Sequence, residues 1–216
     1  MASTDFRLLD PAQVCPEHPT LPIADRKGET YCFNCIVSAF QTQAYSVACR
    51  ILNDRFTAED AVQEGLTSAY RSFGQFRGDN LKGWLMRIVV NTCRDMLRAS
   101  RARPSVPLDP TPPDPDSDDG VLSVADIPSG EESPEDYAER GALRNIIERA
   151  LAAISAERRE AIVLVDVEGF SYEEAATALN CSVGTVKSRI SRGRRELRDI
   201  LREAGELLPS GFRQEQ

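Results

Sequence analysis

Apolar residues recur at steps of three and four along two separate stretches of this 216-residue chain, and that spacing is typical of amphipathic α-helices. The first stretch starts with Phe33, Ile36, Val37 and Phe40, and the second starts with Leu143, Ile146 and Ile147. Runs of Val, Ile, Thr and Tyr that would favour strands are scarce. The periodicity therefore predicts an all-α chain with two small helical domains.

The N-terminal stretch divides into three expected helices. The first begins near Cys32, after a polar segment that contains prolines. Thr57 occupies the expected N-cap position of the second helix, with Asp60 at the capping-box position. After a glycine-containing turn, the third helix should run from about Trp84 to Ser100. The inward positions expected for the second and third helices are Ala61, Val62, Leu66, Ala69 and Tyr70, then Leu85, Ile88, Val89, Thr92 and Met96.

Residues 104–136 separate the two helical stretches and differ from them in composition. They contain eight prolines and ten carboxylates, with no lysine or arginine. Such a segment buries too little apolar surface to offset its ordering entropy, so the sequence predicts a disordered acidic linker. An inert spacer is the alternative interpretation. The expected organisation of the rest of the chain is an N-terminal extension over residues 1–30, a first domain over 31–103, a second domain over 137–204 and a C-terminal tail over 205–216.

The second domain ends in a pattern typical of a helix-turn-helix. Ser171 and Glu174 occupy the two ends of a capping box that opens a short helix. Asn180 and Cys181 then form an expected tight turn, in which Asn180 takes the left-handed conformation. Ser182 caps a long final helix. The inward positions expected for that helix are Val183, Val186, Ile190, Leu197 and Ile200.

The outward face of this final helix is strongly basic. Residues 182–202 hold seven basic and two acidic side chains, a net charge of +5, although the whole chain carries −8. Thr185, Ser188, Arg189 and Arg192 are expected on this face. Short hydroxyl side chains allow close approach to base edges, and arginines reach guanines or phosphates. A merely solvated basic helix is the alternative, but the cap, the turn and the inward apolar pattern together favour DNA binding.

The residues from Arg159 to Leu201, and above all "GTVKSR" followed by "RGRRELR", resemble region 4 of extracytoplasmic-function sigma factors. In that family the final helix enters the major groove of the −35 promoter element, and region 4 also meets the β flap of RNA polymerase. The resemblance implies that the −35 element is contacted by Thr185, Lys187, Ser188, Arg189 and Arg192.

A second basic face is expected on the third helix of the N-terminal domain. Arg87, Asn91, Arg94 and Arg98 recur at i, i+4, i+7 and i+11, so they share one side, and residues 87–103 carry a net charge of +4. Trp84 lies one turn earlier. Cations beside an aromatic ring suit a separated nucleic-acid strand, because phosphates need cations and bases need a stacking surface. Packing of Trp84 in the core is an equally good alternative.

Two segments of this domain resemble region 2 of the same family. "AEDAVQE" resembles the part that docks on the clamp helices of the polymerase β′ subunit, which assigns Glu59, Asp60, Gln63 and Glu64 to polymerase binding. "FGQFRGDNLKGWLMRIVVNTCRDMLRASRAR" resembles the part that melts and binds the −10 element, so the basic face with Trp84 should bind that strand. The family often has an aromatic residue and a threonine before this tryptophan, where the chain has Leu81 and Gly83.

The resemblance implies a non-catalytic initiation factor that binds core RNA polymerase and both double- and single-stranded promoter DNA, with an anti-sigma factor as a further candidate partner. A stand-alone helix-turn-helix regulator is the alternative, but it leaves "AEDAVQE" and "WLMRIVVN" unexplained. An enzyme is disfavoured because the chain has one histidine and no GxSxG, Walker or HExxH motif. With no signal peptide and no long apolar run, the chain is expected to be cytoplasmic and to make no membrane contact.

The N-terminal extension carries a candidate metal site that the family does not require. Cys15 and His18, then Cys32 and Cys35, form a C-x2-H…C-x2-C pattern, and sulfur and imidazole ligands in two short pairs suit tetrahedral zinc. Such a zinc site would be structural, and its thiolates would also make it a candidate oxidant sensor. The alternative is four unrelated residues. The other three cysteines, Cys49, Cys93 and Cys181, are expected to be structural.

Overall fold

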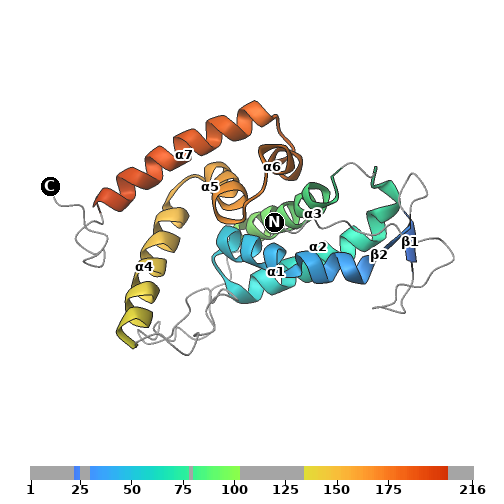
Figure 1. The fold of residues 1–216 in the computed structure, drawn as a ribbon, viewed down its shortest axis with the longest axis horizontal. Helices are drawn as coiled ribbons and strands as arrows, with labels where there is room; N and C mark the ends of the chain where they lie inside the picture. Colours follow the sequence, from blue (N-terminus) through green and yellow to red (C-terminus); the bar gives the residue numbers. More distant parts are fainter. Residues whose placement is uncertain (1–21, 25–29, 78–79, 103–133, 204–216) are drawn as a thin grey trace.

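The computed structural model describes residues 22–24, 30–77, 80–102 and 134–203 (Figure 1). The N-terminal half contains β1 (Pro22–Ala24), β2 (Thr30–Cys32), α1 (Phe33–Leu52), α2 (Arg55–Ser72), the 3₁₀ turn η1 (Phe73–Gln75) and α3 (Leu81–Ala102). The C-terminal half contains α4 (Pro134–Ala153), α5 (Ala156–Ile162), the π-helical turn η3 (Val163–Val167), α6 (Tyr172–Leu179) and α7 (Val183–Glu203). The predicted all-α class is confirmed, with one small hairpin added.

The hairpin consists of β1 and β2, which pair antiparallel with Ile23 opposite Tyr31. Periodicity did not predict it, because three-residue strands are too short to show an alternating pattern. The Tyr31 ring packs edge-on against Phe73 and Phe76, at centroid distances of 5.5 and 6.4 Å. The hairpin is therefore fixed to the helical domain at the point where α1 begins.

Helices α1, α2 and α3 pack around a shared apolar core, and three predicted details differ from the structure. The second helix is capped by Asp54, whose side chain accepts a hydrogen bond from the Thr57 backbone N–H at 2.7 Å, so Thr57 is not the N-cap. Tyr70 is 45% exposed and leans on Phe33 instead of facing inward. The fully buried residues of α3 are Leu85, Met86, Val89, Val90 and Cys93, which places the inward face slightly to one side of the predicted one.

The C-terminal half begins with α4 at Pro134, three residues before the predicted domain start. The predicted capping box is confirmed: the Ser171 hydroxyl accepts from the Glu174 N–H, and the Glu174 carboxylate accepts from the Ser171 N–H. Asn180 takes the left-handed conformation at φ 53°, and the Ser182 hydroxyl accepts from the Thr185 N–H. The predicted helix-turn-helix is therefore formed by α6, a short turn and α7.

The two halves pack against each other and share one continuous buried core. Helix α6 packs against α3, and α5 with η3 packs beside α1 (Figure 1). Side chains from both halves enter this cluster, among them Val89 of α3 and Ala175 of α6. A smaller apolar cluster of Leu151, Ile154 and Ile162 ties α4 and α5 to the end of α7. Among the described helices, none is both long and apolar enough to cross a membrane.

Candidate nucleic-acid interface

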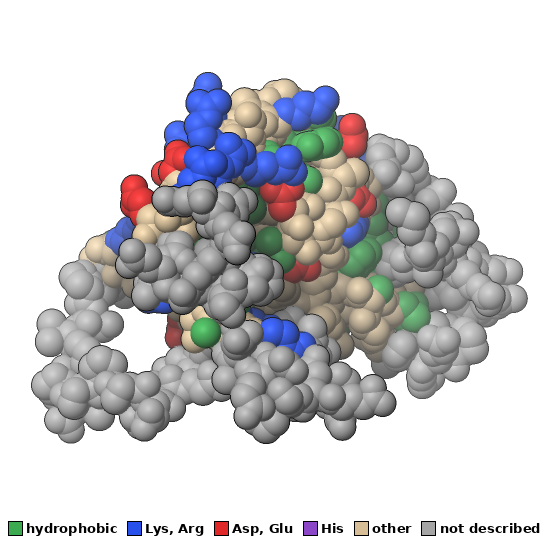
Figure 2. All heavy atoms as spheres, turned by 60° about the vertical axis from the view of Figure 1, so that its left-hand side comes forward, with side chains coloured by type: hydrophobic (Ala, Val, Ile, Leu, Met, Phe, Trp, Pro, Cys, Tyr) green, Lys and Arg blue, Asp and Glu red, His purple; other side chains and the backbone are tan. Residues whose placement is uncertain are grey.

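Helix α7 presents a basic surface on the outside of the molecule. Lys and Arg side chains gather over α7 in the space-filling view (Figure 2), and the exposed ones are Lys187, Arg192, Arg194, Arg195, Arg198 and Arg202. The inward face of the helix carries Val186 and Ile190, both buried as predicted. Gly193 also faces inward, because a Cβ there would lie 2.7 Å from Ile162 Cδ1. Close packing on α5 thus leaves the opposite face of α7 open.

The five residues predicted to read duplex DNA lie in the first three turns of α7. Lys187, Ser188 and Arg192 are exposed, whereas Thr185 and Arg189 are half-buried. The Thr185 hydroxyl is 2.9 Å from that of Ser182, and the Ser188 hydroxyl donates to the Thr185 carbonyl at 2.9 Å. The structure therefore brings the predicted hydroxyl and basic groups together on one helix end.

Two arginines of this region already have carboxylate partners. Arg189 donates to Glu157 of α5 at 2.8 Å, and its other nitrogen lies 3.8 Å from the Cys181 sulfur. Arg194 forms a bidentate pair with Asp166 of η3, at 2.9 and 2.6 Å. The Glu157 carboxylate is 71% exposed, so DNA phosphate can replace it at Arg189 at modest cost. Arg194 instead ties α7 to its own domain.

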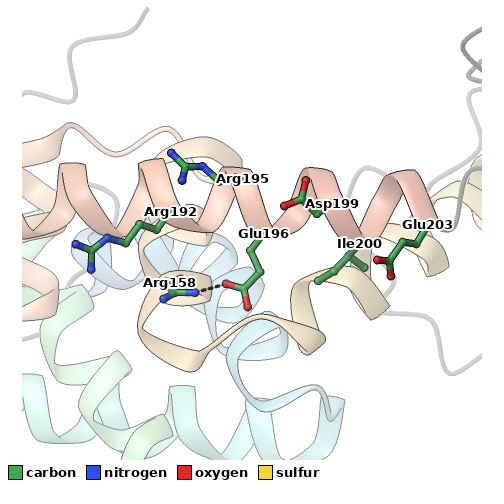
Figure 3. Close-up of a pocket in the computed structure, with 7 residues that line it drawn as sticks. All are labelled: Arg158, Arg192, Arg195, Glu196, Asp199, Ile200 and Glu203. Carbon is green, nitrogen blue, oxygen red and sulfur yellow. Dashed lines mark hydrogen bonds and ion pairs between the residues drawn. The ribbon is translucent and has the colours of Figure 1, made fainter.

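The face of α7 that lines a cavity beside α5 changes from basic to acidic along the helix (Figure 3). A shallow cavity of about 340 Å³ beside α5 is lined by Arg158, Arg192 and Arg195 toward one end and by Glu196, Asp199 and Glu203 toward the other. Arg158 pairs with Glu196, as the dashed line in Figure 3 shows. Carboxylates repel DNA phosphates, so phosphate contact on this face should end near Arg195.

A second cavity, of about 640 Å³, lies where α3 begins. It is lined by Ser72, Gln75, Phe76, Arg77, Asn80, Trp84, Arg87, Ile88, Asn91 and Thr177. Three of the five residues predicted to hold a separated strand therefore meet here: Trp84, Arg87 and Asn91. From the sequence, residues 72–80 were interpreted only as a turn inside the segment that resembles region 2. Gln75, Arg77 and Asn80 were therefore not predicted to line this cavity.

The position of Trp84 fits both of the interpretations considered from the sequence. Its ring packs on Phe73 and Phe76 at centroid distances of 5.7 and 5.4 Å, which anchors it in the core. The residue is only half-buried, and it also lines the cavity. Arg87 and Asn91 are exposed one and two turns further along α3. An aromatic wall with a cation and an amide beside it can stack one base and hold its phosphate.

Arg94 and Arg98 do not join this cavity. Arg94 is turned toward α5, where Nε and Nη2 donate to the two carboxylate oxygens of Glu160 at 3.0 and 2.5 Å. The Glu160 side chain is only 5% exposed. Arg98 pairs with Asp95 on the exposed surface of α3, at 2.6 Å. Helical spacing predicted one continuous face of four residues. In the structure, Arg94 turns toward the C-terminal half of the chain, while the other three residues remain exposed to solvent.

The four polar residues expected to bind a protein partner are all exposed on α2. Glu59, Asp60, Gln63 and Glu64 face solvent along two turns of the helix. Phe56 lies one turn earlier and is 81% exposed, the most exposed large apolar side chain of the described residues. An exposed aromatic can serve as an anchor for a protein partner, and the acids beside it suit a basic one. Periodicity did not single out Phe56, because it marks only the buried side of a helix.

The cysteines divide into two groups. Cys32 is buried at the end of β2 and Cys35 lies in the first turn of α1, while Cys15 and His18 fall outside the described residues. The described part of the chain alone contains no group of three metal-binding side chains. Cys49 and Cys93 are fully buried, and burial raises the pKa of Cys93 to about 12, so its thiol stays protonated and inert at neutral pH.

Family models match both halves of the chain. That of sigma-70 region 2 matches residues 36–103, and that of sigma-70 region 4 matches residues 144–197. The chain is 35% identical over 184 residues to RNA polymerase sigma-H factor of Pseudomonas aeruginosa, which covers 83% of this chain and 93% of that protein. It is 35% identical over 175 residues to ECF RNA polymerase sigma-E factor of Escherichia coli, covering 78% of this chain and 86% of that protein.

Two solved structures are similar to this fold. One is the sigma factor RpoE in complex with the anti-sigma factor NepR from Bartonella quintana, with a TM-score of 0.57 and 33% identity over 79% of this chain and 96% of that chain. The other is CnrH in complex with the cytosolic domain of CnrY, with a TM-score of 0.53 over 79% of this chain and 88% of that chain. At 24% identity, the second likeness concerns the fold alone.

Proposed function

The chain belongs to the sigma-70 family of RNA polymerase sigma factors, in its extracytoplasmic-function group, and from this premise we propose which of its surfaces bind promoter DNA and which bind the polymerase. As a sigma factor it binds core RNA polymerase and directs it to promoters. A stand-alone regulator would account for α6 and α7 but not for the region 2 match over residues 36–103. The observation that carries the proposal is the presence of two separate surfaces suited to nucleic acid: the exposed basic face of α7 and the cavity beside Trp84 on α3.

Helix α7 enters the major groove of the upstream, −35 element. Lys187, Ser188 and Arg192 are exposed where they can meet bases and phosphates, and Thr185 and Arg189 lie beside them. Direct base contact suits the N-terminal turns because Gly184 and Ser182 are small. Arg194 is paired with Asp166 of η3, and this pair holds α7 in place on its own domain.

Helix α3 captures the separated strand of the downstream, −10 element. The cavity beside Trp84 is large enough to accept a base, and Arg87 and Arg77 stand at its edge to neutralise phosphates. Asn91 supplies a hydrogen-bonding amide on the same wall. Arg94 and Arg98 extend the track toward the end of α3 once Arg94 is released from Glu160.

Helix α2 docks on the polymerase. Its exposed Glu59, Asp60, Gln63 and Glu64 suit a basic helical partner, the β′ clamp helices in this family, and Phe56 adds an apolar anchor at one end. A second polymerase contact, between region 4 and the β flap, follows from the family alone. We also propose an anti-sigma partner, because the similar sigma factor RpoE is bound by one.

Run-off transcription tests the proposed function. The purified chain added to core polymerase lacking sigma should produce transcripts from promoters that core polymerase alone ignores. The promoters are first selected from random DNA with the reconstituted holoenzyme. A stand-alone regulator would bind DNA yet leave core polymerase inactive, so the absence of transcripts with intact DNA binding would favour that alternative.

A zinc ion held by Cys15, His18, Cys32 and Cys35 is a separate proposal about this chain. The positions of the two described cysteines suit it. Cys32 ends β2 and Cys35 lies three residues later, in the first turn of α1, so both thiols lie close to the end of the hairpin. The N-terminus of a helix favours thiolates. A two-stranded hairpin is marginally stable alone, and a tetrahedral zinc would tie its end to the segment before it.

The zinc proposal predicts about one zinc per chain, measured by elemental analysis of protein purified under reducing conditions. Replacing Cys32 and Cys35 with serine should remove the metal and lower the melting temperature of the N-terminal half, because metal binding contributes to folding stability. Cys49→Ser and Cys181→Ser are the matched controls and should retain it. Metal-free wild-type protein with an unchanged melting temperature after the double substitution would exclude the site.

A further inference from the structure

Two aromatic rings, Phe76 and Trp84, line the cavity proposed to receive the separated strand. Their centroids are 5.4 Å apart and their planes are tilted by 50°. Trp84 is held by helix α3, whereas Phe76 follows the 3₁₀ turn η1 in an extended conformation, at φ −63° and ψ 139°. The orientation of the Phe76 ring therefore depends on the side chains packed against it, because no helix fixes its backbone.

Tyr31 of β2 is packed against this wall from within the core. Its ring meets Phe76 and Phe73 edge-on, and Phe73 in turn contacts both Phe76 and Trp84, at centroid distances of 5.6 and 5.7 Å. Tyr31 is only 8% exposed and is not among the residues that line the cavity. Edge-to-face ring pairs prefer particular geometries, so Tyr31 helps to orient the wall without being placed to touch a bound base.

The hairpin that carries Tyr31 is itself held in place by this packing. Its strands have three residues each, and an isolated two-stranded hairpin is marginally stable at best. β1 lies beside η1 (Figure 1), and Tyr31 stands opposite Ile23 in the hairpin register. The sigma-70 region 2 model begins at residue 36, so it does not include the hairpin. This chain therefore supports its cavity wall with an element that precedes the matched region.

We propose that Tyr31 is a positioning residue for capture of the separated −10 strand, and that the N-terminal hairpin is thereby part of the strand-binding site. The proposal rests on the proposed strand-binding function of the cavity beside Trp84. Tyr31 holds Phe76, directly and through Phe73, in the orientation in which Phe76 and Trp84 form one wall. A base that enters the cavity then meets a preformed stacking surface, and its binding does not have to order that surface first.

Trp84 is the only tryptophan of the chain, so intrinsic fluorescence of the full chain reports on the wall directly. Tyr31→Ala should shift the Trp84 emission to longer wavelength and increase its quenching by acrylamide, because the wall loses its support. Tyr31→Phe should keep the wild-type emission, since the ring remains. Ile51→Ala is the matched control and should leave the emission unchanged. It also removes a buried side chain of this domain, but at the opposite end of α1, about 27 Å along the helix from its first residue.

Holoenzyme reconstituted with Tyr31→Ala should bind a fluorescein-labelled −10 strand of a selected promoter about five- to tenfold more weakly than the wild type does. Removal of a stacking ring costs about five- to 150-fold in affinity, and Tyr31→Ala misplaces the wall without removing either of its rings. Affinity for core polymerase and for duplex −35 DNA should be unchanged, because the exposed surfaces of α2 and α7 are untouched. Tyr31→Leu fills most of the space and protects the fold, and it should weaken strand binding in the same direction.

A double-mutant cycle with Phe76→Ala tests whether Tyr31 works through Phe76. Once Phe76 is truncated, Tyr31→Ala should weaken strand binding by only about threefold or less, because the effects of residues that act through one another are not additive. A general loss of stability would instead produce the same five- to tenfold effect of Tyr31→Ala in both backgrounds. Circular dichroism of each variant shows whether it remains helical.

The positioning role is overturned if helical Tyr31→Ala and Tyr31→Leu bind the strand with wild-type affinity, or if Ile51→Ala weakens strand binding as much as Tyr31→Ala does. It is equally overturned if Tyr31→Phe is as weak as Tyr31→Ala, because the ring would then not be what matters. Trp84→Ala tests the proposed function separately. Wild-type strand affinity of Trp84→Ala contradicts strand binding at this cavity, whereas weak binding by Trp84→Ala with unchanged binding by Tyr31→Ala contradicts the positioning role alone.

Discussion

Replacing both Arg189 and Arg192 with alanine is expected to abolish promoter-specific transcription while leaving polymerase binding intact. Arg192 is exposed on α7, and Arg189 lies beside it with an exposed carboxylate, Glu157, that DNA can replace. A good bidentate contact to a base contributes about 1–3 kcal/mol. Loss of two such contacts should weaken holoenzyme binding to a selected promoter by about a hundredfold or more. The measurement is fluorescence anisotropy with duplex promoter DNA, followed by run-off transcription.

Arg194→Ala is the control for that result, because Arg194 pairs with Asp166 and faces its own domain. It should alter promoter affinity by much less, since an exposed ion pair contributes only about 0–1 kcal/mol. If Arg194→Ala weakens binding as strongly as the double substitution, the assignment of the reading face on α7 is wrong. Permanganate footprinting then distinguishes α7 from α3. At holoenzyme concentrations that saturate the promoter, an opening defect should remain only for Arg94→Ala with Arg98→Ala.

Local sequence patterns predicted the helix-turn-helix closely because its determinants are local. A capping box needs only Ser171 and Glu174 three residues apart, and the turn needs only a residue such as Asn180 that tolerates a positive φ. The same reasoning failed at the start of α2, where Asp54 and Thr57 are both good N-cap residues. The choice of Asp54 follows from Asn53, whose left-handed conformation at φ 55° ends α1 and leaves Asp54 extended.

Contacts between residues far apart in the chain were not predictable in this way. Helical spacing placed Arg94 on one face with Arg87 and Arg98, but its partner Glu160 is 66 residues away on another helix. The expected two-domain organisation likewise did not indicate a shared core, because amphipathic faces do not specify their partners. Phe56 lay outside the pattern altogether, since an exposed apolar residue has no effect on helical periodicity.

Reversing the charges of Glu59 and Asp60 to lysine is expected to weaken binding of the chain to core polymerase by a hundredfold or more. Each loss of an interfacial charge partner costs about 2–5 kcal/mol, and reversal adds repulsion from a basic partner. The fold should be unaffected, because both side chains are exposed on α2 and neither touches the core. Titration of labelled core polymerase, with circular dichroism of each variant, measures the two effects separately.

The matched control reverses Asp199 and Glu203 instead, which changes net charge by the same amount at the far end of α7. This control should retain affinity for core polymerase in the absence of DNA. The difference in affinity between the wild type and the Glu59 and Asp60 reversal should also become smaller as the salt concentration rises. The reason is that surface charges are screened over about 8–10 Å at physiological ionic strength. Phe56→Ser should weaken binding without that salt dependence, since it removes apolar contact and no charge. If both double reversals weaken binding equally, net charge and not the α2 surface determines affinity, and the docking assignment fails.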